Sequence, residues 1–163
     1  MHIESMQEMT EFAEKYTGPK SKVLDVGSYY VNGSYQTIFN DYTGLDIIDG
    51  PNVDIVAKKP YKWDIKDNTF DVVISGQAFE HIEFPEKTMD EIARVLKPGG
   101  YCCIIAPSTG PKHDFPNDFR RYNETSFRAL AVGCGLAVVS VVVNVTPIWN
   151  DAVLIAKKRG GKK

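Results

Sequence analysis

Three short segments combine residue types that can bind a nucleoside. Segment 23–33 begins with a strand-like run that ends at Gly27. A parallel strand that ends in glycine brings backbone close to a ligand at the carboxyl edge of a sheet. Asp46 lies 19 positions after Gly27, and its two carboxylate oxygens suit the two hydroxyls of a ribose. Ser75 and Gly76 end a third apolar run. Together they predict a nucleoside site, although a plain turn at Gly27 and a solvated acid at Asp46 are the alternatives.

Spacing rules out two other nucleotide-binding motifs. A P-loop needs a second glycine five positions after Gly27, where the sequence has Asn32. A dinucleotide fingerprint needs glycines at positions 29 and 32, which are Tyr29 and Asn32. The P-loop is therefore excluded, and a nicotinamide-dependent oxidoreductase is disfavoured.

Two histidines are candidates for acid–base chemistry, because an imidazole titrates near neutral pH. His81 follows Glu80 just after the run that ends at Ser75, and a packed structural role is the preferred interpretation there. His113 lies in the segment 107–124, which is rich in proline, aspartate, asparagine and aromatic residues and reads as a functional or capping loop.

Strand-like and helical runs alternate along the chain, which predicts an α/β fold with helices covering a mostly parallel sheet. We predict strands over 22–27, 42–47, 53–57, 70–75, 101–106, 136–145 and 151–157. We predict helices over 1–17, 33–40, 89–96 and 125–132, the third of them ended by Lys97-Pro98-Gly99-Gly100. The last two strands are joined by a short loop, so they should be antiparallel.

Length and composition favour a single domain over residues 1–163. The chain is 43% hydrophobic and 25% charged, as in globular proteins, and we expect neither a membrane span nor a secretory signal. Five of the 19 basic residues lie in the tail 157–163, which we expect to be flexible, so the rest has 14 basic and 21 acidic residues. This acidic body argues against a nucleic-acid-binding face.

Cysteine usage indicates a reducing compartment. Cys102, Cys103 and Cys134 are odd in number and form no C-x-x-C pair, so neither a disulfide framework nor a structural zinc site is expected. Adjacent Cys102 and Cys103 should point to opposite faces of a strand. We predict that all three are buried in strands and that the protein is cytoplasmic.

The segments 70–75 (Phe-Asp-Val-Val-Ile-Ser) and 94–100 (Arg-Val-Leu-Lys-Pro-Gly-Gly), together with the Gly27 turn, resemble the class I S-adenosylmethionine-dependent methyltransferases, in their small, type 11-like branch. The resemblance extends from about Lys22 to Lys157. It implies a Rossmann-like three-layer sandwich, a seven-stranded sheet of order 3-2-1-4-5-7-6 with strand seven antiparallel, and S-adenosylmethionine as cofactor.

The resemblance also implies which residues bind that cofactor. These are Asp25, Gly27 and Ser28 for the methionine part, Asp46 for the ribose, Ile47 for the adenine, and Ser75, Gly76 and Gln77 for the floor of the site. The family often has an acid after strand three that accepts from the adenine amino group, where this chain has Lys58 and Lys59. Asp64 is our candidate to replace that acid, and Trp63 is our candidate to stack on the adenine.

The loop 107–122 resembles the family segment that overhangs the cofactor's methyl group. His113 is the candidate catalytic base, with Asp114 or Asp118 to orient it, and Arg120 or Arg121 to hold an anionic substrate. A lid in which these arginines and aspartates pair with one another is the alternative. Methyl transfer is an in-line displacement that can rely on positioning alone, so a base is not required.

The sequence therefore predicts a methyltransferase that acts on a small molecule, such as a sugar or glycan precursor. It shows no separate substrate domain, and its site loop is short. The alternative is a degenerate, non-catalytic member that binds a nucleoside ligand or a protein partner, a hypothesis supported by Tyr29, Lys58 and Lys59. No metal ligand set was expected, and the sequence does not determine the oligomeric state.

Overall fold

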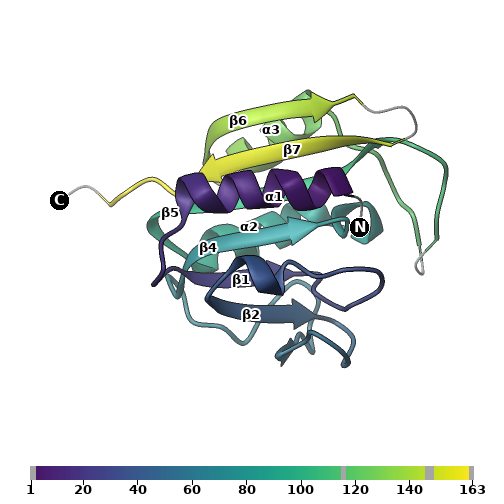
Figure 1. Cartoon of the computed structure of the whole chain (residues 1–163). Helices are drawn as coiled ribbons and strands as arrows, with labels where there is room; N and C mark the ends of the chain where they lie inside the picture. Colours follow the sequence, from purple (N-terminus) through teal and green to yellow (C-terminus); the bar gives the residue numbers. More distant parts are fainter. Residues whose placement is uncertain (1–2, 115–116, 146–148, 162–163) are drawn as a thin grey trace.

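The computed structural model describes residues 3–114, 117–145 and 149–161 (Figure 1). Its strands form one seven-stranded sheet of order β3-β2-β1-β4-β5-β7-β6, which confirms the predicted fold class and strand order. The strands are β1 (Lys22–Val26), β2 (Asp41–Asp46), β3 (Ile55–Val56), β4 (Phe70–Gly76), β5 (Leu96–Thr109), β6 (Ala137–Asn144) and β7 (Asn150–Lys157). The helices are α1 (Ile3–Tyr16), α2 (Pro85–Val95) and α3 (Glu124–Gly133), with 3₁₀ turns η1 (Gln36–Ile38) and η2 (Phe79–His81).

The sheet is parallel from β3 to β5, and β7 is antiparallel to both of its neighbours. The carboxyl ends of β1, β2 and β4 therefore meet at one edge, where ligands bind in open α/β sheets. In Figure 1 this edge is on the right, where the loops after β2, β4 and β5 emerge.

Helices cover both faces of the sheet, because alternate strand residues point to opposite sides. Leu24, Val73 and Cys102 pack with α2 and α3 on one face. On the other face Val72 and Cys103 pack against α1, which crosses in front of the sheet in Figure 1. The opposite orientations predicted for Cys102 and Cys103 are confirmed.

Local sequence signals start the two later helices. α2 begins at Pro85, whose fixed φ and missing N–H suit the first helical position. α3 begins with a capping box, in which the Asn123 side chain accepts from the Ser126 amide and the Ser126 hydroxyl accepts from the Asn123 amide.

Several predicted elements differ from the structure. The helix predicted over 33–40 is reduced to the single turn η1, and the third strand has only two residues. Segment 97–100 does not follow the helix as a turn but belongs to β5, because the Gly99 amide donates to Lys158 O and the Lys158 amide donates to Gly100 O. Cys134 was expected in a strand, but it is the residue that caps α3 at its C-terminal end.

The first two residues of the predicted flexible tail 157–163 make defined contacts in the structure. Lys157 is the last residue of β7, and the Lys158 ammonium donates to Asn68 Oδ1 and to Leu96 O. Residues 162–163 of that tail, 1–2 of the predicted first helix and 115–116 of the predicted loop lie outside the described residues. Within the described ranges, no helix combines the length and apolar character needed to cross a bilayer.

Candidate functional site

A cavity of about 550 Å³ opens at the carboxyl ends of β1, β2 and β4. Its volume is in the range of pockets that enclose small-molecule ligands. Nine predicted site residues line it: Asp25, Gly27, Ser28, Asp46, Ile47, Trp63, Gly76, Gln77 and His113. The topology brings them together from five segments of the chain.

The turn after β1 lets backbone form one wall of this cavity. Gly27 has φ +82°, and a Cβ there would collide with Ala78 Cβ, so the turn after β1 lies directly against the turn after β4. Tyr29 stands where the family pattern has a second glycine, but its ring packs on the backbone of Gly50. Tyr29 therefore lines the cavity without closing it.

The Asp46 carboxylate is fixed at the cavity by backbone amides. Its Oδ1 accepts from the amides of Ile47 (2.7 Å) and Ile48 (3.2 Å), and its Oδ2 accepts from the Tyr29 amide at 3.1 Å. A carboxylate offers about four acceptor positions, so these amides leave one free position for a ligand hydroxyl. A second ribose hydroxyl would replace one of the present amide contacts.

Asp25 is a buried carboxyl at the base of the cavity. Its side chain is almost fully buried, and the Tyr42 hydroxyl donates to its Oδ2 at 2.6 Å. Burial raises the pKa of Asp25 to about 7, because removal from water disfavours the charged form. A ligand ammonium placed near Asp25 would favour the ionised form.

Apolar side chains form the wall predicted for the adenine. Ile47 lines the cavity although 57% of its surface is exposed to solvent, so it offers an apolar face to a ligand. Trp63 also lines the cavity, and its indole N–H donates to Pro60 O. Asp64 is exposed and does not line the cavity, so the structure gives no support to its predicted role. The exposed Lys58 and Lys59 also lie outside the lining.

The floor of the cavity is supported from below by α1. A Cβ at Gly76 would collide with the Tyr35 ring, and the buried Tyr35 hydroxyl is 2.5 Å from Ser5 Oγ of α1. Ser75 is fully buried and donates to Val26 O, so it joins β4 to β1 instead of lining the cavity as predicted.

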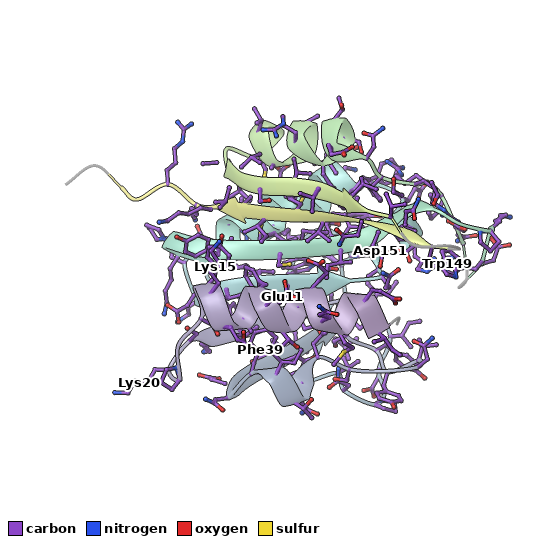
Figure 2. All side chains as sticks on the ribbon, turned by 45° about the horizontal axis from the view of Figure 1, so that its top comes forward. Glu11, Lys15, Lys20, Phe39, Trp149 and Asp151 are labelled. Carbon is purple, nitrogen blue, oxygen red and sulfur yellow. The ribbon has the colours of Figure 1, made fainter. Side chains whose placement is uncertain are left out.

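Gln77 adopts a left-handed backbone conformation, with φ +58°, which is uncommon for this residue type. Its amide donates to Ile105 O, and its side-chain amide donates to Asp151 Oδ2 at 2.9 Å. Strained backbone of this kind occurs at functional sites, where the surroundings hold it in place. Figure 2 shows Asp151 and Trp149 at the same end of the sheet.

The segment 110–123 places His113 at the cavity but not the two arginines. Asp118 accepts from the His113 backbone amide at 2.8 Å and forms a two-pronged ion pair with Arg121, which holds the pKa of the Asp118 carboxyl below its usual range. Arg120 donates to Glu83 O. Both arginines line a separate surface hollow of about 460 Å³. Neither arginine lines the cavity, and the pairing of Arg121 with Asp118 matches the alternative interpretation, a lid whose arginines and aspartates pair with one another.

Asp114 and Asp118 were both proposed to orient His113. Asp118 Oδ2 lies 3.6 Å from His113 Nδ1, whereas Asp114 lies 3.0 Å from the Lys112 ammonium. Asp118 is the better placed of the two. The His113 ring also packs edge-on against Trp149, with ring centroids 5.3 Å apart.

The structure adds a buried acid that the sequence did not single out as functional. Glu80, on η2, is fully buried, and His81 Nε2 and His113 Nε2 lie 3.6 Å and 3.5 Å from its Oε1. Burial raises the pKa of Glu80 to about 7 and lowers the pKa of His81. The adjacent Glu80-His81 pair on a turn after a strand was the available signal.

Comparisons with known proteins agree with this arrangement. The sequence model of a family described as "Methyltransferase domain" matches residues 24–104. An uncharacterized methyltransferase of Schizosaccharomyces pombe is 46% identical over 43 residues, 26% of this chain and 16% of that protein. A reducing polyketide synthase of Botryotinia fuckeliana is 32% identical over 68 residues, 42% of this chain and 3% of that protein. The matches thus span a small part of these relatives' length.

Solved structures share the fold over nearly the whole chain. A 1,6-didemethyltoxoflavin-N1-methyltransferase of Burkholderia thailandensis superposes with a TM-score of 0.75 and 17% identity, covering 95% of this chain and 78% of that one. That protein was crystallised with bound 1,6-didemethyltoxoflavin and S-adenosylhomocysteine. The individual cofactor roles of the lining residues here stay predictions. The family model covers 81 of the 163 residues, and the strand order and the shared fold agree with it: the chain is similar to the class I S-adenosylmethionine-dependent methyltransferases of the type 11 branch, as the sequence predicts.

Proposed function

We propose that this protein transfers a methyl group from S-adenosylmethionine to a small-molecule acceptor, with a sugar or glycan precursor as the acceptor class to test first. The observation that carries the proposal is the Asp46 carboxylate, which three backbone amides hold in a cavity opposite the Gly27 turn. We also propose that it works in the cytoplasm, since an odd number of cysteines without a framework is typical of reducing compartments.

Bound in this cavity, the cofactor supplies an electrophilic methyl group on sulfur. The chain's own residues bind and position it: Asp46 accepts from the ribose, Asp25 favours a nearby ammonium, and the Gly27 turn allows close backbone approach. The cofactor would supply the methyl group for an in-line displacement, and these residues would hold it in place for the acceptor. Positioning of the two reactants supplies much of the rate enhancement in such a displacement.

In this proposal His113 takes the proton that a hydroxyl or amine acceptor loses. It lines the cavity, and Asp118 lies beside its Nδ1. The small-molecule class is supported by the cavity itself, because the 110–123 segment contributes His113 and Asp114 to its wall. A macromolecular acceptor would have to approach past this segment.

Calorimetric titration with S-adenosylmethionine and S-adenosylhomocysteine tests the cofactor part. We expect micromolar binding, and we expect Asp46→Ala to weaken it by about 10- to 100-fold, since a hydrogen bond to a charged group contributes roughly 1.5–3 kcal/mol. Asp49→Ala is the matched control, because Asp49 is an exposed acid three residues away that does not line the cavity. Thermal unfolding shows whether each variant is folded.

The outcomes separate the alternatives. No binding of either adenosyl compound by the wild-type protein supports the degenerate, non-catalytic hypothesis and overturns this proposal. Binding of NAD in the same titration would support an oxidoreductase instead. With binding established, release of S-adenosylhomocysteine is measured against a panel of sugars and sugar nucleotides. Turnover with none of the sugars, but with other small molecules, overturns the sugar assignment alone.

A further inference from the structure

Glu80, His81 and His113 form a polar cluster at one end of the cavity. Each offers one ligand atom, and these three atoms all lie within 4.8 Å of one another. His81 and His113 line the cavity, whereas Glu80 is fully buried. The three residues come from η2 and from the 110–123 segment, so the fold of that segment completes the cluster.

The Glu80 carboxyl group lacks the partners that its burial calls for. Neither of its oxygens has a hydrogen-bond partner among the described residues, although both are inaccessible to water. Buried carboxyl groups in folded proteins are paired, hydrogen-bonded or bound to metal ions, because desolvation is otherwise costly. This orphaned side chain, aimed between two imidazoles, indicates that the site takes a further group.

The two histidines present the right atoms to such a group. His81 Nδ1 lies 2.5 Å from Asn117 O, so this nitrogen carries the proton and leaves the Nε2 lone pair free. His113 Nε2 points toward Glu80, while its Nδ1 faces the Asp118 carboxylate. Asn117 O gives His81 the hydrogen bond on the far nitrogen that orients metal-binding histidines, whereas His113 Nδ1, 3.6 Å from Asp118, has no hydrogen-bond partner among the described residues.

The spacing also suits a small cation. Ligand atoms bound tetrahedrally at about 2.1 Å from an ion lie roughly 3.4 Å from one another. The two distances from Glu80 Oε1 to the imidazole nitrogens are 3.5 and 3.6 Å. All three ligand atoms lie within 4.8 Å of one another, so a modest contraction would bring them to this spacing.

We propose that Glu80, His81 and His113 bind a divalent transition-metal ion of the zinc type, with an open coordination position facing the cavity. Two imidazoles and one carboxylate are a ligand set for Zn²⁺ or Fe²⁺, whereas Mg²⁺ and Ca²⁺ prefer oxygen ligands. Three protein ligands leave the remaining position for water or for an oxygen of the acceptor. Metal binding itself does not depend on the proposed methyl transfer, although a role of the ion in holding the acceptor does. With the ion bound, His113 is a ligand and does not act as the base proposed above, so its two roles are alternatives.

Cobalt binding to the untagged protein tests the site. Co²⁺ is added to EDTA-treated protein, and the visible absorption of the bound ion is followed to saturation. We expect one equivalent to bind with a dissociation constant in the micromolar range and Zn²⁺ to displace it. Glu80→Gln and His113→Ala should each weaken binding by more than about tenfold, since even residues that only support a ligand cost 10–100-fold.

One control variant and one second test variant make the result decisive. Glu83→Gln alters an exposed acid next to the cluster and should bind cobalt like the wild-type protein. His113→Ala removes a side chain that is 41% exposed, so it tests the site even if Glu80→Gln fails to fold. Saturation only above about 1 mM, or equal binding by all variants, overturns the proposal. Titration with S-adenosylhomocysteine in EDTA reports separately on the proposed function, because the cofactor cavity does not need the ion.

Discussion

The buried carboxyl of Asp25 should make the stability of the protein fall as the pH rises. Its pKa is about 7 in the folded protein, against 3.8 for an unperturbed aspartate, the value expected in the unfolded chain. Between these values the folded protein holds a proton that the unfolded chain releases. The contribution to stability is therefore fully present below pH 3.8 and is lost as the pH rises through about 7.

The size of the effect follows from the shift. About three pH units at roughly 1.36 kcal/mol each give about 4 kcal/mol over the whole window, of which about 3 kcal/mol falls between pH 5 and pH 8. Asp25→Asn removes the titration and keeps an oxygen that can accept from the Tyr42 hydroxyl. Relative to wild type, the Asn variant should therefore gain up to about 3 kcal/mol in unfolding free energy from pH 5 to pH 8.

Urea unfolding at pH 5, 6, 7 and 8, on both proteins, measures this gain. The difference between them is the informative quantity, because burial also raises the pKa of Glu80 and this contributes to both curves. Asp49→Asn, at an exposed acid, should differ from wild type by no more than about 0.5 kcal/mol at every pH. A difference between wild type and Asp25→Asn that stays constant from pH 5 to pH 8 would refute the reasoning.

Three further substitutions test the packing around the site by urea unfolding at one pH. Gly76→Ala should lower the unfolding free energy by about 1–3 kcal/mol, because the new Cβ collides with the Tyr35 ring. Gly133→Ala, with open space around it, should be neutral or stabilising by up to about 1 kcal/mol. Equal effects of the two substitutions would contradict the predicted collision. Phe127→Ala should cost about 3–5 kcal/mol, since the side chain is fully buried, and a loss below 1 kcal/mol would be inconsistent with that burial. Asn123→Ala should cost about 0.5–2 kcal/mol by removing the cap of α3, and an unchanged midpoint would argue against the capping box.

Sequence reasoning located the strands because their apolar runs are continuous and sharply bounded. Phe70–Gly76 is an example, since both of its faces are covered and its buried residues follow one another. The strand order itself came from the family resemblance, as local patterns do not encode which strands are neighbours. Where local signals were misleading, pairing with distant residues decided the structure: Gly99 and Gly100 read as a helix stop, yet their hydrogen bonds to Lys158 make them part of β5.

The candidate site, like the fold, could be predicted only in part from the sequence. Gly27 and Asp46 could be grouped because the ends of parallel strands share one edge of the sheet. The sequence could not show that Gly76 lines the cavity and Ser75 does not, since only the structure shows the Ser75 hydroxyl donating to Val26 O. The burial of Glu80 and the pairing of Arg121 with Asp118 depend on tertiary contacts, such as the hydrogen bond from the Phe119 amide to Glu80 O, which local sequence patterns do not encode.

The contact between Ser5 and Tyr35 has a practical consequence for dissecting the molecule. Family matching begins at residue 24, so a fragment cut at that border would lack α1 and would leave the Tyr35 hydroxyl without its partner in the interior. Because the same tyrosine packs against Gly76, the N-terminal helix supports the position of the cavity floor. Expression of a shortened version should therefore give a protein whose binding properties are altered even though every lining residue is retained.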